Sequence, residues 1–131
     1  MRAILVISAV FFSLGYQVNS SLAKSASIVG SWRGSGVIKP HNQATEKTRC
    51  RATVRKASTN HFTASYRCSS SIGVATQRVR VRKIGANVYS GSFYNSQHNV
   101  RGVVNISVRG NSQSVSLRSA KGTGYIRMRK R

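Results

Sequence analysis

Hydrophobic and polar residues alternate with a period of two along most of the chain from residue 28 onward. In the stretch TQRVRVRK, Val79 and Val81 alternate with Arg78, Arg80 and Arg82. This period is typical of a strand with one face in a core and the other in water. Since no long segment shows the 3.6-residue period of an amphipathic helix, the pattern predicts an all-β protein.

Eight short strands are predicted, separated by glycine- and asparagine-containing turn signals such as residues 85–87 and 110–113. The predicted strands are 28–37, 48–56, 62–68, 77–84, 88–94, 100–109, 114–119 and 124–130. Residues 39–47 are expected to form a mobile loop. Short connections favour a small up-and-down antiparallel barrel of about eight strands, because closure removes the sheet edges. A two-layer β-sandwich is the alternative.

The two cysteines test this interpretation. If the strands around them form a hairpin that turns near residue 59, Cys50 lies opposite Cys68 on the inner face. The same register places Arg51 opposite Arg67 on the outer face. Opposed cysteines on neighbouring antiparallel strands are close enough for a cross-strand disulfide, so we predict one between Cys50 and Cys68.

A second register follows from the turn signal at residues 110–113. A hairpin centred on this segment places Val108 opposite Val115 and Ile106 opposite Leu117. All four side chains then share the inner face of the predicted barrel.

The first 23 residues have the organisation of a secretory signal peptide. Arg2 is followed by an apolar run over residues 3–14, and small residues at 21 and 23 suit signal-peptidase cleavage after Ala23. The run is shorter than the roughly 20 residues of a membrane span, and an uncleaved signal anchor is the alternative. Residues 24–131 are therefore predicted to be a single β domain, exported to a periplasm or to the outside of the cell, where a disulfide can form.

The charge of the chain is extreme, with 22 Lys and Arg residues against one acidic residue and a net charge of +21. Removal of Arg2 with the signal peptide lowers this to +20. A small soluble domain needs a net charge of only roughly 2–8, so the excess points to anionic partners. The candidate anion-binding residues are Arg49, Arg51, Arg55, Arg67, Arg78, Arg80, Arg82, Lys83, Arg127, Arg129, Lys130 and Arg131.

Residues suited to catalysis or metal binding are sparse. Catalysis by paired carboxylates needs two acids, whereas Glu46 stands alone. His41, His61 and His98 are widely separated and are expected in turns, so neither a metal site nor a cofactor is predicted. Trp32 is expected to plug the closed end of the barrel, and its alternative role is to line a small-ligand cavity at the mouth.

Several short motifs carry a family resemblance. They are GSWRGSG (30–36), RCR (49–51), YRCSS (66–70), SGSF (90–93) and NVRG (99–102). This layout resembles small exported proteins of rhizobia-like bacteria, a largely uncharacterised group with a Gly-Trp-x-Gly-x-Gly first strand and two cysteines on adjacent strands. The resemblance implies an exported β-barrel and no particular activity. The arginine excess of this chain departs from that group.

Two functions follow as hypotheses. The first is a non-enzymatic binding protein that attaches electrostatically to polyanions, either lipopolysaccharide phosphates of the envelope or nucleic acid, without reading bases. The alternative is a secreted effector or inhibitor that binds an acidic protein of a host or competitor, since charge complementarity steers such encounters.

Overall fold

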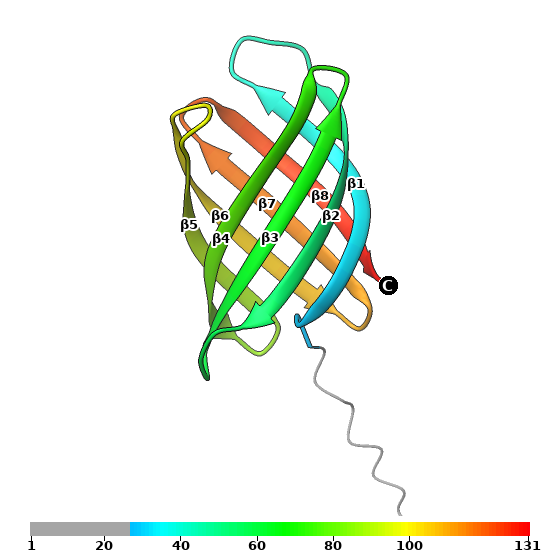
Figure 1. Cartoon of the computed structure of the whole chain (residues 1–131), viewed down its shortest axis with the longest axis vertical. Coiled ribbons are helices and arrows are strands. Elements are labelled where there is room, and N and C mark those ends of the chain that lie inside the picture. The colour runs from blue at the N-terminus through cyan, green and yellow to red at the C-terminus, as the bar shows by residue number, and fades with distance from the viewer. Residues whose placement is uncertain (1–26) are drawn as a thin grey trace, which may run out of the picture.

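A computed structural model describes residues 27–131, in which eight antiparallel strands form a closed barrel (Figure 1). The strands are β1 (Gly30–Pro40), β2 (Glu46–Lys56), β3 (His61–Ser70), β4 (Gly73–Gly85), β5 (Val88–Asn95), β6 (Val100–Arg109), β7 (Ser112–Ser119) and β8 (Gly122–Lys130). Each strand pairs with the next, and β8 pairs with β1. The up-and-down barrel is therefore confirmed, and closure excludes the two-layer sandwich.

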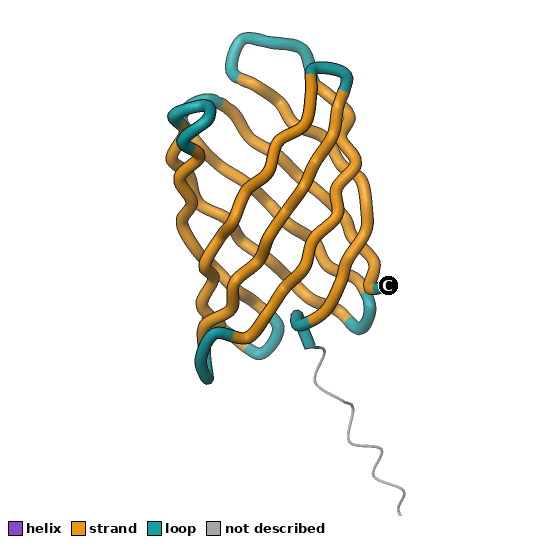
Figure 2. Tube along the Cα trace, viewed as in Figure 1, coloured by secondary structure: helices purple, strands orange, loops and turns teal. Residues whose placement is uncertain are grey.

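The tube in Figure 2 consists of strands and short connections, and the described residues include no helix that could cross a membrane. The predicted signal peptide, residues 1–23, lies outside the described part of the chain.

All eight predicted strands are present, and several are longer than the alternation suggested. β1 extends to Pro40 because its last residues still pair with the first residues of β8, and Pro40 lies opposite Gly122. β2 begins at Glu46. The connection predicted at 39–47 is consequently reduced to residues 41–45.

The barrel has two different ends. Residues 27–29, Arg131 and the turns at 57–60, 86–87 and 110–111 form what we call the terminal end. Connections 41–45, 71–72, 96–99 and 120–121 form the loop end. Figure 1 shows the strands tilted steeply between the two ends.

The hydrophobic core lies mainly in the half of the barrel nearest the terminal end. Trp32, Ile106 and Met128 are buried there, and Ile28 covers them from the N-terminal side. Inward-facing residues nearer the loop end, such as Ile38 and Val100, are only half-buried. The barrel is thus packed and closed at the terminal end, where the chain enters and leaves it.

The β1–β8 seam requires a glycine at position 34. A Cβ atom built there would overlap the backbone carbonyl oxygen of Arg127 on β8. Any larger residue would have to push the two strands apart, which overpacking arguments place at about 1–3 kcal/mol or more. Gly34 therefore allows the close approach that completes the barrel.

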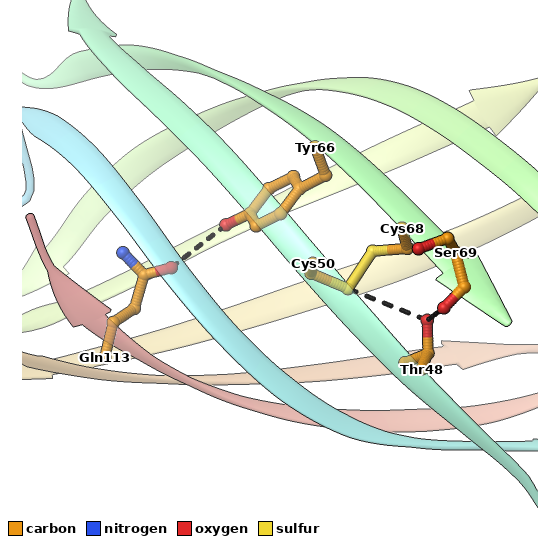
Figure 3. The surroundings of a disulfide bond; sticks show 6 residues. All are labelled: Thr48, Cys50, Tyr66, Cys68, Ser69 and Gln113. Carbon is orange, nitrogen blue, oxygen red and sulfur yellow. Dashed lines mark hydrogen bonds between the residues drawn. A yellow bond between two sulfur atoms is a disulfide. The ribbon is translucent and has the colours of Figure 1, made fainter.

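The predicted register of β2 and β3 is confirmed. Cys50 lies opposite Cys68 and the two form a disulfide, while Arg51 lies opposite Arg67 on the outer face. Figure 3 shows the disulfide inside the barrel, beside the hydroxyl of Thr48. The alternation of the two strands determined both pairings.

The predicted register of β6 and β7 is wrong by two residues. Val108 lies opposite Gln113 rather than Val115, and Ile106 lies opposite Val115. The cause is a tight turn of only two residues, 110–111, whose first residue, Gly110, has a φ of 57°. Glycine at the first position suits a type II′ hairpin turn. A slip of two residues leaves each side chain on its predicted face.

Candidate anion-binding surface

The predicted anion-binding arginines on the strands point outward from the barrel, whereas Lys83 and Lys130 occupy inward-facing register positions. Eleven of the twelve are exposed, and Lys130 alone is half-buried. Alternation explains this arrangement, because each arginine follows or precedes an inward-facing residue on its strand. The chain contains a single acidic residue, Glu46, so these cations have one side-chain carboxylate to share among them within the protein.

Four arginines form a row directly across four neighbouring strands. Arg129 of β8 lies opposite Arg33 of β1, which lies opposite Arg51 of β2. Arg51 in turn lies opposite Arg67 of β3. Adjacent strands are about 4.8 Å apart, so the row concentrates four guanidinium groups within a short distance. We call these four residues the arginine row.

A second row runs beside the first, two residues nearer the loop end, and arginine alternates with serine along it. Arg127 lies opposite Ser35, which lies opposite Arg49, and Arg49 lies opposite Ser69. Ser114 of β7 completes this row next to Arg127. Ser112 holds the matching position beside Arg129.

These ten residues form one surface, which we call the basic wall. They are Arg33, Arg49, Arg51, Arg67, Arg127, Arg129, Ser35, Ser69, Ser112 and Ser114. All ten line a single groove of about 1670 Å³, and Arg109 and Arg131 line the same groove at the terminal end. The wall therefore presents six guanidinium groups and four hydroxyl groups to one hollow.

The wall joins two predicted patches through a residue that the sequence reasoning missed. Arg49, Arg51 and Arg67 were expected on one hairpin, and Arg127 and Arg129 at the C-terminus. Arg33 lies between these two groups because β1 pairs with both β2 and β8. Its position between inward-facing Trp32 and Gly34 was the signal that could have identified it.

The predicted anion-binding residues on β4 lie outside the groove. Arg80 and Arg82 extend along β4 beyond the basic wall, and Arg55 belongs with them because Thr63 separates it from Arg80. Arg78 lies closer to the basic wall, since it lines a smaller hollow of about 430 Å³ together with Arg51 and Arg67 of the wall. The positive surface thus continues from the wall onto β4. Lys83 is exposed at the terminal end, although its register faces inward.

Lys130 and Trp32 both help to close the terminal end. Trp32 is fully buried, and its indole N–H donates a hydrogen bond of 2.9 Å to the carbonyl oxygen of Ile28. The amine of Lys130 lies 5.4 Å from the centre of the Trp32 ring and donates to the carbonyl oxygen of Ser27. Trp32 is therefore part of the packed core at this end, and the Lys130 side chain is engaged in covering it.

Tyr125 is the aromatic residue that lines the groove. It is 44% exposed, and its hydroxyl donates to the Ser114 hydroxyl at 3.5 Å. The hydrogen bond with Ser114 and the neighbouring Arg127 lower the pKa of Tyr125 from its usual value. Both neighbours therefore stabilise the deprotonated form of the Tyr125 hydroxyl.

The histidines and the single carboxylate do not converge. His41 and His98 lie in connections, as predicted, whereas His61 begins β3 and bonds Ser58. Glu46 accepts a hydrogen bond from the Ser71 hydroxyl at the loop end. Among residues 27–131, no three His, Cys, Asp or Glu residues are grouped as metal ligands would be.

No protein-family model and no curated protein matches the chain. Solved structures do resemble it, and three of the most similar are designed barrels. The redesigned barrel mFAP1, bound to DFHBI, is 10% identical, with a TM-score of 0.63 over 79% of this chain and 94% of its own. A fluorescence-activating β-barrel designed de novo is 15% identical, with a TM-score of 0.60 over 79% of this chain and 93% of its own.

The third, the redesigned barrel b11L5F_LGL, is 13% identical, with a TM-score of 0.60 over 86% of this chain and 98% of its own. At these identities the likeness concerns the fold alone. It supports the eight-stranded barrel and says nothing about a ligand of this chain.

Proposed function

We propose that this protein is an exported, non-enzymatic binding protein that attaches to polyanions through its basic wall. The observation that carries the proposal is the arginine row, in which four like charges lie directly opposite one another on adjacent strands. Opposed like charges destabilise a sheet. Each such pair costs on the order of 1 kcal/mol at close range in water. When phosphates or carboxylates lie against the row, attraction between opposite charges outweighs the repulsion between the arginines.

The chemistry of the wall suits phosphate groups. A guanidinium group binds a phosphate with two parallel hydrogen bonds, and a serine hydroxyl can donate one more. Arg127, Ser35 and Arg49 alternate across three strands, so each anion placed there meets donors of both kinds. Such contacts attach the protein to a charged polymer or surface without requiring a particular sequence of bases.

The first test is the salt dependence of binding to heparin and to duplex DNA. Each contact with a heparin sulfate or a DNA phosphate releases condensed counterions, so the logarithm of the binding constant should fall linearly with the logarithm of the salt concentration. We expect Arg51→Ser/Arg67→Ser to weaken binding at low salt. The slope of the binding constant against salt concentration on logarithmic axes should also become shallower, by about the amount that two contacts contribute. Titration by fluorescence anisotropy at several salt concentrations measures both quantities.

A matched control removes the same charge elsewhere. Arg101 and Arg118 are exposed on β6 and β7 and do not line the groove. Arg101→Ser/Arg118→Ser should therefore change the slope much less than the pair in the arginine row. Equal effects of the two double variants would show that only net charge matters and would reject the wall as the site. One-to-one binding to an acidic protein that survives moderate salt would instead favour an effector or inhibitor.

A further inference from the structure

The basic wall ends in exposed apolar residues at the loop end. Ile72, at the tip of the turn between β3 and β4, is 74% exposed, and Val74 is 50% exposed. Val74 lies opposite Ser69, the last residue of the second row of the wall. The turn therefore extends the wall with apolar side chains that have no place in the barrel core.

Apolar side chains also lie on the wall beside the second row. Val37 is 40% exposed and Tyr125 is 44% exposed. The two are cross-strand partners, and Lys47 is the other partner of Val37. A hollow of about 700 Å³, lined by Val37, Lys47 and Arg49 among others, connects this region with the groove. One side of the barrel is thus cationic in its middle and apolar toward the loop end.

We propose that this side of the barrel docks on the surface of an anionic phospholipid bilayer, with the turn bearing Ile72 inserted among the lipid headgroups. The proposal rests on the polyanion-binding function and names its partner. Interfacial binding of this kind combines buried apolar area with attraction to anionic lipids. The positive charge and the exposed apolar area are both present on the same surface. Attraction to anions alone would not account for the apolar residues, and apolar contact alone would not account for the arginines.

The dimensions of the wall fit a bilayer surface. Ile72 is three positions beyond Ser69 and lies in the turn that follows β3, so it projects at most about 10 Å beyond Ser69 at about 3.3 Å per residue. A headgroup layer is roughly 5–7 Å thick on each side of the hydrocarbon. Insertion of Ile72 to the base of this layer therefore places Arg49 near the phosphates. The arginine row then lies within about one Debye length, the range over which anionic lipids attract basic residues.

Nucleic acid explains the apolar end less well. A phosphate backbone offers nothing apolar against which Ile72 or Val74 could be buried. Binding of single strands also relies on several aromatic side chains that stack with bases, and Tyr125 is the aromatic residue lining the groove. A bilayer accounts for the charge and for the exposed apolar residues together.

The test compares Ile72→Ser/Val74→Ser with the unmodified protein in co-sedimentation with vesicles. Vesicles of phosphatidylcholine with about 30% phosphatidylglycerol should bind the unmodified protein, and pure phosphatidylcholine vesicles should not. We expect the double variant to bind the anionic vesicles at least about tenfold more weakly, because burial of two aliphatic side chains is lost. Its affinity for heparin should be unchanged, which also shows that the variant is folded.

The matched control is Ile84→Ser. Ile84 is 53% exposed and lies at the opposite end of β4, on the terminal end of the barrel. This variant should bind anionic vesicles as the unmodified protein does. In a second readout, the tryptophan fluorescence of Ile72→Trp should shift to the blue when anionic vesicles are added, because the new side chain enters the headgroup layer. Trp32 is buried and contributes a constant background.

The outcomes of these experiments distinguish failure of bilayer docking from failure of polyanion binding. Unchanged vesicle affinity of the Ile72/Val74 variant, or no spectral shift for Ile72→Trp, would overturn docking through the loop end. Binding to heparin or DNA without binding to anionic vesicles would reject the bilayer and retain the polyanion function. Binding to none of these probes would reject both.

Discussion

At the scale of single residues, the core contains one polar contact that crosses the barrel. The hydroxyl of Tyr66 on β3 donates to the side-chain oxygen of Gln113 on β7 at 3.3 Å (Figure 3). The amide nitrogen of Gln113 is buried and has no hydrogen-bond partner within residues 27–131. An unsatisfied buried donor costs about 1–3 kcal/mol. The cost of the unpartnered amide nitrogen therefore offsets the stability that the hydrogen bond contributes.

The environment of Tyr66 predicts a loss of stability at high pH. Burial raises the pKa of Tyr66 above its usual value near 10. Below pH 10 the hydroxyl is neutral in both states, and its contribution to stability is fully present. Above pH 10 the unfolded chain ionises first, so the free energy of unfolding should fall by up to about 1.4 kcal/mol per pH unit. Urea unfolding between pH 9 and 11 measures this fall.

The control for the pH prediction is Tyr66→Phe, which lacks the hydroxyl. Lysines also titrate in this range, but they are common to both proteins. The variant should therefore show a shallower decline of stability with pH. Parallel curves for the two proteins would contradict the assignment to Tyr66.

At the scale of elements, the basic wall depends on how β1 meets its two neighbours. The sequence places arginine on the outer face of each strand, but Arg33 joins Arg51 to Arg129 only when β1 pairs with β2 and β8 at one particular register. The disulfide links β2 to β3, the two strands that carry Arg51 and Arg67. Closure and cross-link together hold the arginines in their row against their mutual repulsion.

Removal of the disulfide should lower stability without opening the barrel. Cys50→Ala/Cys68→Ala releases a cross-link between residues separated by 18 positions, which corresponds to about 3 kcal/mol in the chain-entropy model. Pairing around the closed sheet remains, so the far-ultraviolet circular dichroism should stay that of a β-protein. Chemical unfolding measures the stability difference, and an unchanged unfolding midpoint would contradict this expectation.

At the scale of the whole molecule, charge opposes the compact state. The net charge is +21 and the chain has a single acidic residue, so the positive charges are not balanced by negative ones. Repulsion among these charges destabilises the folded protein. The fold tolerates this through its closed hydrogen-bonded sheet and its buried core at the terminal end. Any bound polyanion should relieve the repulsion.

Salt should accordingly stabilise the free protein. We expect the melting temperature to rise by several degrees between about 20 mM and 300 mM sodium chloride, since relief of about 1 kcal/mol shifts a domain of this size by roughly 4–8 °C. A polyanion such as heparin should raise it further at low salt through mass action. Differential scanning calorimetry measures both effects. A melting temperature that falls as salt is added would contradict the idea that repulsion limits stability.

The alternation of residues by itself determined the fold class, the eight strands, the face of each side chain and the pairing of Cys50 with Cys68. These features are local, because they depend on a period of two and on one hairpin. The register of β6 and β7 depended on the length of one tight turn, which composition does not specify. Only the tertiary structure decided the register at which β8 meets β1, and hence that Arg33 joins two distant patches into one wall, since closure brings together strands from opposite ends of the chain.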